Sequence, residues 1–285
     1  MKGTKGYMKT PLRELQLAEL EILKDIVKVC ELNDIEYFLS GGTLLGAVRH
    51  KGFIPWDDDV DIAMPREDFE KFIRIAPEML SVEHKLKTYQ LEDTFLSYVP
   101  KVVNESILVE DLSGMIRKEI PAWVDVFPLD GITDSPFIKP IFKVRLLYRR
   151  CIYKISCFED IVAVAELDRP LVERVIIFLC KNLKIQKLFS TKKQLIKLDK
   201  LLKTYDSVSS NYYMNFMGAY KLKQIVHKDI YGNGGKYRFE QYEFNGPEDY
   251  DSYLKHFYGD YMELPPKSKR NKHYTSIGEV QDGEI

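Results

Sequence analysis

The chain lacks the uninterrupted run of about 20 apolar residues that a membrane-spanning helix needs, so no transmembrane segment is expected. Its first residues, Met1 to Gly6, are basic, but the apolar segment of a secretory signal does not follow them. Cysteine is scarce and never occurs in CxxC spacing, which argues against a zinc site or a disulfide framework. These absences predict a cytoplasmic protein whose thiols are reduced.

The sequence also lacks internal repeats, low-complexity tracts and any recognisable RNA-binding motif, so no nucleic-acid partner is expected. Its 285 residues are 45% hydrophobic and 30% charged, an ordinary balance for a globular protein of one large or two modest domains. The net charge of −1 hides a basic segment between Lys139 and Lys203, with about 16 Lys and Arg against about 6 Asp and Glu. This segment suggests an anionic neighbour such as a membrane surface, a phosphate-rich glycan or nucleic acid; the alternative is a solvated helical face.

A dense carboxylate run occupies residues 57–61, within the segment Pro-Trp-Asp-Asp-Asp-Val-Asp-Ile that begins at Pro55. The apolar residues around the run indicate a partly buried strand; the alternative is a solvated acidic loop. Because residues two apart on a strand share a face, Asp57, Asp59 and Asp61 are predicted to project together. Carboxylates this close repel one another unless a hard cation neutralises them. The run therefore predicts a Mg²⁺ (or Mn²⁺) site for phosphoryl or nucleotidyl transfer.

Two glycines, Gly41 and Gly42, separate a predicted strand over 35–40 from a predicted helix over 43–48. Backbone N–H groups at a helix start hold phosphate oxygens, and glycine permits their close approach. A tight turn alone would have the same composition. Together with the carboxylates downstream, however, the turn resembles a nucleotidyltransferase-type fold, in which both features face one nucleotide.

That fold usually takes a third carboxylate from a neighbouring strand. Asp125 is the candidate, because it is polar within the otherwise apolar, strand-like segment 123–127. The alternative is a strand residue that simply faces outward.

The predicted fold is α/β (α+β): a nucleotidyltransferase-like mixed sheet with flanking helices and a basic helical insertion. Helical and extended patterns are mixed over residues 1–135, which are predicted to form the catalytic core. Residues 136–210 are predicted to form the basic helical segment. Residues 211–285 are rich in Tyr and Gly and are expected to complete the active site.

The first helix predicted in the basic segment carries an apolar stripe at helical spacing. The stripe consists of Ile141, Val144, Leu147, Tyr148, Cys151 and Ile155. Phe142 and Leu146 lie off it. Such a helix either packs on its own domain or lies on an anionic membrane.

Three motifs resemble the LicD family: Gly-Gly-Thr-Leu-Leu-Gly-Ala-Val-Arg-His over 41–50, Gly-Phe-Ile-Pro-Trp-Asp-Asp-Asp-Val-Asp over 52–61, and Asp-Val-Phe-Pro-Leu-Asp over 125–130. Weaker similarity lies over 12–16 and 258–273, so the resemblance reaches both ends of the chain. Members of this family are phosphocholine transferases of bacterial surface glycans. Fukutin and fukutin-related protein are more distant relatives that act on phosphorylated polyols. The resemblance implies a nucleotidyltransferase-like fold, a divalent cation and a CDP-activated donor.

The resemblance and the charges together suggest a role for each site residue. Asp59 and Asp61 are expected to bind the cation, with Asp57 completing the cluster. Asp125 is expected either to add a metal ligand or to take the proton of the acceptor hydroxyl. The residues expected to contact substrate are Gly41, Gly42, Thr43, Arg49, Lys51 and His273. The alternatives are solvated loop cations for Arg49 and Lys51, and a structural histidine.

The expected activity is Mg²⁺-dependent transfer of phosphocholine from CDP-choline to a sugar hydroxyl of a cell-surface glycan. The acceptor would be a teichoic acid, lipopolysaccharide or capsule precursor on a lipid carrier. The basic segment would then contact the inner membrane leaflet peripherally. The alternatives are transfer of glycerol or ribitol phosphate from its CDP donor, and a non-catalytic nucleotide-binding module.

Overall fold

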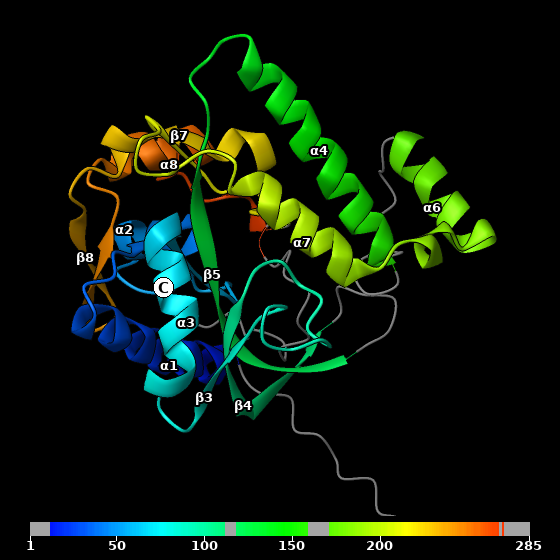
Figure 1. The fold of residues 1–285 in the computed structure, drawn as a ribbon. Coiled ribbons are helices and arrows are strands. Elements are labelled where there is room, and N and C mark those ends of the chain that lie inside the picture. The colour runs from blue at the N-terminus through cyan, green and yellow to red at the C-terminus, as the bar shows by residue number, and fades with distance from the viewer. Residues whose placement is uncertain (1–11, 112–117, 159–170, 268–269, 271–285) are drawn as a thin grey trace, which may run out of the picture.

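The structure is a computed structural model that describes residues 12–111, 118–158, 171–267 and 270. A mixed sheet with helices around it forms the body of the molecule (Figure 1), which confirms the predicted nucleotidyltransferase-like α+β fold. The first elements in chain order are α1 (Leu12–Leu32), β1 (Phe38–Leu39), α2 (Gly41–Arg49), β2 (Val60–Pro65), α3 (Arg66–Met79), β3 (His84–Lys87), β4 (Lys101–Asp111) and β5 (Lys118–Gly131).

The helical insertion follows β5, and short elements follow the insertion. The insertion contains α4 (Ile138–Ser156), α6 (Leu171–Leu183), η1 (Ile185–Leu188) and α7 (Thr191–Leu202). The remaining elements are β6 (Tyr212–Met214), η2 (Lys221–Gln224), β7 (Ile225–His227), η3 (Lys228–Ile230), β8 (Gly235–Phe239), β9 (Tyr242–Gly246) and α8 (Tyr250–Tyr258). Among the described residues, no helix is both long and apolar enough to cross a membrane.

The main sheet has the strand order β1-β2-β5-β4-β3, and β6 and β7 extend it beyond the end of β5. β2 and β5 are parallel, whereas β4 and β5 are antiparallel. In this register Asp125 of β5 lies opposite Asp61 of β2 on one side and opposite Lys101 of β4 on the other. The sheet therefore brings three charged side chains together at its centre.

Two hydrophobic clusters stabilise the molecule. The larger one joins α1, the sheet, α2 and α3 to residues of β8, β9 and α8, so the C-terminal segment packs on the N-terminal core. The smaller one joins α4 and α7 to β6 and to the loop before β4, with Phe142, Leu146 and Leu198 almost fully buried. This second cluster fixes the helical insertion on the sheet domain.

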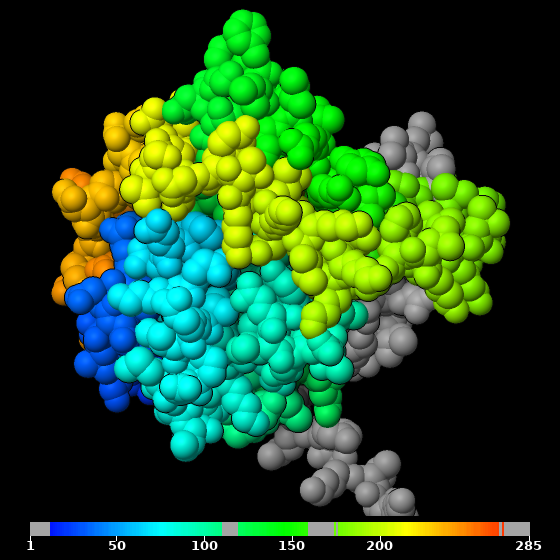
Figure 2. All heavy atoms as spheres, in the orientation of Figure 1, coloured from blue at the N-terminus to red at the C-terminus, as the bar shows by residue number. Residues whose placement is uncertain are grey.

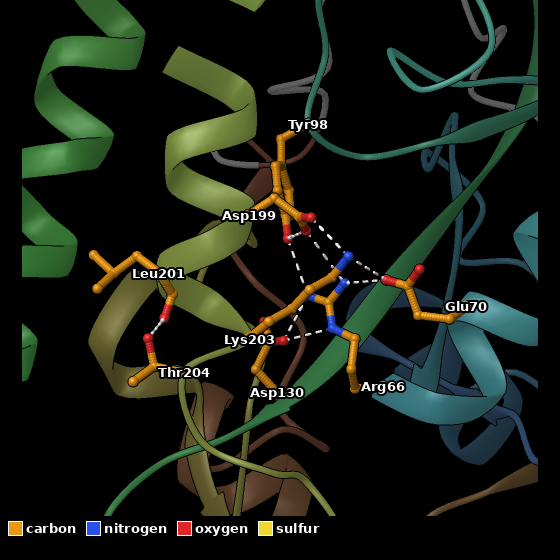
Figure 3. Close-up of polar contacts among 8 residues, drawn as sticks. All are labelled: Arg66, Glu70, Tyr98, Asp130, Asp199, Leu201, Lys203 and Thr204. Carbon is orange, nitrogen blue, oxygen red and sulfur yellow. Dashed lines mark hydrogen bonds and ion pairs between the residues drawn. The ribbon is translucent and has the colours of Figure 1, made fainter. Parts of the chain in front are cut away.

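A buried polar cluster connects the two parts (Figure 3). The Arg66 guanidinium, at the start of α3, donates to Asp130 of β5 over 2.7 Å and to the Tyr98 hydroxyl over 3.0 Å. The Tyr98 hydroxyl in turn donates to Asp199 of α7 over 3.0 Å. Lys203, just after α7, pairs with Asp199 and with Glu70 of α3. Charged groups in the interior need such partners, so this cluster determines how α7 sits against α3.

The structure buries the side of the basic helix that lies off the predicted apolar stripe. Phe142 and Leu146 of α4, which lie off the predicted apolar stripe, are the buried residues, whereas Ile141 and Val144 of the stripe are 63% and 65% exposed. Both sides of the helix are apolar, and α7 packs on the side that carries Phe142 and Leu146. The stripe therefore does not pack on its own domain.

Candidate active site

The first turn of α2 forms one wall of the candidate site. Both glycines lie inside the helix and not before it as predicted, because Ser40 takes the N-cap position and its carbonyl accepts from Leu44 N–H over 3.3 Å. Gly41 has φ +54°, a left-handed conformation that glycine adopts without strain. Its N–H donates to the hydroxyl of Tyr253 in α8 over 3.3 Å. The N–H groups of Gly42 and Thr43 also belong to this first turn, which has no intrahelical acceptors, and they remain suited to an anion.

The side chain of Thr43 serves the scaffold. Its Oγ1 atom accepts a 2.8 Å hydrogen bond from the backbone N–H of Asp61. The carbonyl of Asp61 accepts from Ser40 N–H over 3.0 Å. These two bonds fix the start of α2 against β2, so the glycine turn and the carboxylates keep a constant separation.

Three side chains of the carboxylate run lie close together just before the N-terminal end of β2. Carboxylate oxygens of Asp57, Asp58 and Asp59 lie within 4.8 Å of one another, so Asp58 joins two of the three residues expected there, and the third, Asp61, is not part of this cluster. β2 begins only at Val60, because a turn closed by the 2.9 Å bond from Asp57 N–H to the Ile54 carbonyl precedes it. Strand alternation therefore does not apply to residues 57–59. Oxygen ligands at this spacing fit a hard divalent cation.

Asp61 and Asp125 extend the negative charge along the sheet. Burial raises the pKa of Asp61 well above its usual value, and the carboxylates of Asp59 and Asp125 raise it further. Asp125 accepts hydrogen bonds from Lys101 Nζ at 2.8 and 2.9 Å and from the indole Nε1 of Trp123 at 3.0 Å. Lys101 also opposes the rise in the pKa of Asp61. A lysine thus holds the predicted third carboxylate, and sequence reasoning did not identify it.

Two further polar residues come from the buried face of α1. Gln16 Nε2 donates to the carbonyl oxygens of Asp57 over 3.0 Å and Ile54 over 3.4 Å, which supports the carboxylate loop. Glu19 is 0% exposed, and neither of its carboxylate oxygens has a hydrogen-bond partner among the described residues. Burial, and then Asp59 and the neighbouring carboxylates, raise its pKa well above the ordinary value. Sequence reasoning did not identify Gln16 and Glu19. Their polar side chains, three positions apart on the otherwise apolar face of α1, were the pattern that could have indicated them.

Of the residues expected to contact phosphate, Arg49 lies at the cavity and Lys51 does not. Arg49 lines the cavity, where its Nη1 donates to the Tyr261 carbonyl over 2.6 Å, and burial lowers its pKa. Lys51 is exposed on the turn after α2, where its carbonyl accepts from Glu240 N–H over 2.7 Å. His273 lies outside the described residues.

Some of these groups line a cavity of about 660 Å³, whereas Asp125, Lys101 and Lys51 are not among its lining residues. Gly41, Gly42, Asp57, Asp59 and Asp61 line it on the side of the core. The rest of the lining comes from the C-terminal half of the chain and includes Asn215, Tyr220, Gln224, Tyr258, Tyr261 and Pro265. The cavity is large enough for a nucleotide-sized ligand.

Comparison with known proteins is consistent with this geometry. A family model described as "LicD/FKTN/FKRP, nucleotidyltransferase domain" matches residues 34–105, which include α2, the carboxylate run and Lys101. The lipopolysaccharide cholinephosphotransferase LicD of Haemophilus influenzae is 30% identical over 275 residues, which cover 93% of this chain and 97% of that protein. The ribitol 5-phosphate transferase FKRP of Homo sapiens is 48% identical over 48 residues, which cover 17% of this chain and 10% of that protein.

Proposed function

Because the chain belongs to the LicD family, we propose that it is a phosphotransferase that moves phosphocholine from CDP-choline to a sugar hydroxyl of a cell-surface glycan. The main support is that a helix N-terminus and the carboxylates Asp57, Asp59 and Asp61 face one cavity. A diphosphate needs both, N–H groups for its oxygens and a cation for its charge. The acceptor is a lipopolysaccharide, teichoic acid or capsule precursor, held on a lipid carrier.

We assign the cation to Asp57 and Asp59, with Asp61 as the further carboxylate on the same cavity wall. Mg²⁺, or Mn²⁺ in its place, prefers oxygen ligands and is commonly held by one or two carboxylates together with phosphate groups of the substrate. When bound, the cation neutralises charge on the diphosphate and on the departing nucleotide. The carboxylate oxygens within 4.8 Å of one another fit such an ion.

The residues of the chain position the donor and move one proton. The N–H groups of Gly42 and Thr43 bind phosphate oxygens, and Arg49 contributes positive charge from the last turn of α2. The acceptor oxygen forms a bond to the phosphorus that carries choline, the bond from that phosphorus to the bridging oxygen breaks, and CMP leaves with the electron pair. Asp125 takes the proton of the acceptor hydroxyl, and Lys101 keeps its carboxylate in place.

We assign recognition of the nucleobase to Gln224. Its side chain lines the cavity and is 9% exposed, and its Oε1 atom has no hydrogen-bond partner within the described part of the chain. A buried amide oxygen gains stability from a donor, and the exocyclic amine of cytosine is a donor of the right kind. The amide of Gln224 offers a donor and an acceptor side by side, which matches the N3 and N4 atoms of cytosine.

A second candidate has the same site and another donor. The family model whose description names FKRP covers the carboxylate run, and FKRP is named a ribitol 5-phosphate transferase, so ribitol phosphate from CDP-ribitol is the alternative transferred group. The two donors share CDP and differ only in the alcohol, which is why the choice between them needs a binding experiment.

The test is thermal stabilisation of the purified protein by CDP-choline, CDP-glycerol and CDP-ribitol, each with and without Mg²⁺. A ligand that binds only the native state raises the melting temperature, and a ligand at 100 times its Kd adds about 2.7 kcal/mol. We expect the largest rise with CDP-choline and Mg²⁺, and we expect Asp59→Asn to abolish the Mg²⁺-dependent part. Asp229→Asn, at an exposed aspartate, is the matched control.

Each outcome is informative. A larger rise with CDP-ribitol or CDP-glycerol would keep the mechanism and replace the transferred group. No rise with any CDP-alcohol would overturn the proposed donor class. A rise that does not depend on Mg²⁺, together with no CMP release in the presence of acceptor, would indicate a non-catalytic nucleotide-binding module.

A further inference from the structure

The side of α4 that faces away from the domain carries a row of large apolar side chains. Phe137, which precedes the helix, is 82% exposed, and Ile141, Val144 and Tyr148 are 63%, 65% and 60% exposed. These positions follow helical spacing, so their side chains share one side of α4. Single exposed apolar residues are ordinary, but a continuous row usually marks a binding surface. We call Phe137, Ile138, Ile141, Val144, Leu147 and Tyr148 the α4 stripe.

The opposite side of α4 is buried against the domain, which fixes the position of the stripe. Phe142, Leu146 and Tyr153, on the other side of α4, are at most 2% exposed and belong to the cluster shared with α7. The Arg150 guanidinium lies over the Phe216 ring at 5.5 Å, and it donates to the Phe216 carbonyl. α4 forms the edge of the molecule that projects furthest at the top of Figures 1 and 2.

Positive charge accompanies the stripe. The sequence of α4 contains six Lys and Arg residues and no Asp or Glu. Lys143, Arg145 and Arg149 alternate with the stripe residues, and none of the three has an ion pair among the residues that the structure describes. An apolar row bordered by cations matches a surface that is apolar inside and anionic outside, which is the surface of an anionic bilayer.

We propose that the α4 stripe binds an anionic phospholipid bilayer. Ile141, Val144 and Tyr148 enter the boundary between headgroups and acyl chains, and Lys143 and Arg145 pair with lipid phosphates. A second copy of the chain is a poorer occupant, because a symmetric contact through α4 would bring these cations against their own counterparts. Bilayer binding goes beyond the phosphotransfer reaction, and its test requires no turnover.

The experiment is sedimentation of the full chain with vesicles of phosphatidylglycerol and phosphatidylcholine, compared with vesicles of phosphatidylcholine alone. We expect binding to the anionic vesicles that weakens as salt rises. Val144→Asp should weaken it about tenfold, since the variant removes one apolar anchor and adds a repelled charge. Val208→Asp is the matched control, because Val208 is also 65% exposed but does not belong to α4. Lys143→Gln and Arg145→Gln should each weaken binding about fivefold.

Val144, Arg145 and Val208 are exposed and Lys143 is half-buried, so every variant should keep its fold, which an unchanged melting temperature verifies. The proposal is overturned if the wild-type chain does not sediment with anionic vesicles. It is also overturned if Val144→Asp and Val208→Asp weaken binding equally. A wild-type dimer that Val144→Asp converts to a monomer, without any vesicle binding, would assign the stripe to a second copy. The response to CDP-alcohols is measured separately, so failure here leaves the proposed reaction untouched.

Discussion

The position that a Cβ atom would take on Gly42 lies 2.8 Å from Oδ2 of Asp57. The glycine therefore allows this carboxylate to rest directly against the first turn of α2. Gly42→Ala should displace the Asp57 carboxylate, because the nearest atom is a side-chain oxygen and not backbone, and should weaken Mn²⁺ or Mg²⁺ binding about tenfold while the fold persists. Metal titration followed by calorimetry measures the affinity.

Gly46→Ala, in the same helix, provides the contrast. There a Cβ atom would lie 2.5 Å from the carbonyl oxygen of Gly52, which is backbone and has little freedom to move. This variant should lower the melting temperature clearly. Equal metal affinity in Gly42→Ala and the wild type would show that Asp57 does not hold the ion.

Substitutions of Asp125 and Lys101 test whether Asp125 is the base that takes the proton of the acceptor hydroxyl. Asp125→Asn keeps the shape of the side chain and its contact with Trp123 but removes the proton acceptor. We expect kcat to fall about 10²- to 10⁴-fold, with the affinity for the CDP donor unchanged. Lys101→Met should also lower kcat, because Asp125 loses the partner that positions it. If Asp125→Asn instead abolishes the Mg²⁺ dependence of donor binding, Asp125 is a metal ligand.

Glu19 predicts a dependence of stability on pH. Its pKa is raised by burial and by the nearby carboxylates of Asp59 and Asp58. A group whose pKa is higher in the folded than in the unfolded state stabilises the fold below the unfolded value, about 4.3, and this contribution is lost as pH rises toward the folded pKa. The free energy of unfolding of Glu19→Gln, relative to the wild type, should therefore increase as pH rises above that value.

Urea unfolding in the presence of a chelator measures this difference. Glu31→Gln, the same substitution at an exposed position of the same helix, is the matched control. A difference between Glu19→Gln and the wild type that stays constant with pH would contradict a neutral, buried Glu19.

The Arg66 cluster predicts a large loss of stability from one substitution. Arg66→Met would leave Asp130, which is 2% exposed, as an unpaired buried carboxylate. Removing one partner of a buried ion pair costs about 3–5 kcal/mol of the free energy of unfolding. Arg74→Met, at an exposed position of α3, should change it by less than about 0.5 kcal/mol.

The double variant Arg66→Met with Asp130→Leu separates charge from packing. It removes both ions, so it should recover part of the stability that Arg66→Met loses. A double variant as unstable as the sum of the two single losses would mean that the pair contributes through shape and not through charge.

The sequence by itself determined the features that depend on residues close together in the chain. The glycine turn, the carboxylate run and the alternation of helices and strands were all predicted from such residues. The strand period did not place the carboxylates correctly, because β2 begins only at Val60. The family resemblance rested on the same local motifs. The nucleotidyltransferase-like fold followed from these features, and the structure confirms it.

Only the tertiary structure decided which side of α4 is buried and which groups meet across the sheet. Helical spacing shows that α4 is apolar on two sides, but the choice of Phe142 over Ile141 depends on α7, whose position is set by Arg66 and the residues around it. Lys101 reaches Asp125 through strand register, and Tyr253 reaches Gly41 across 212 positions of sequence. Long-range pairing minimises unpaired buried charge and empty volume over the whole molecule, and no local pattern contains that information.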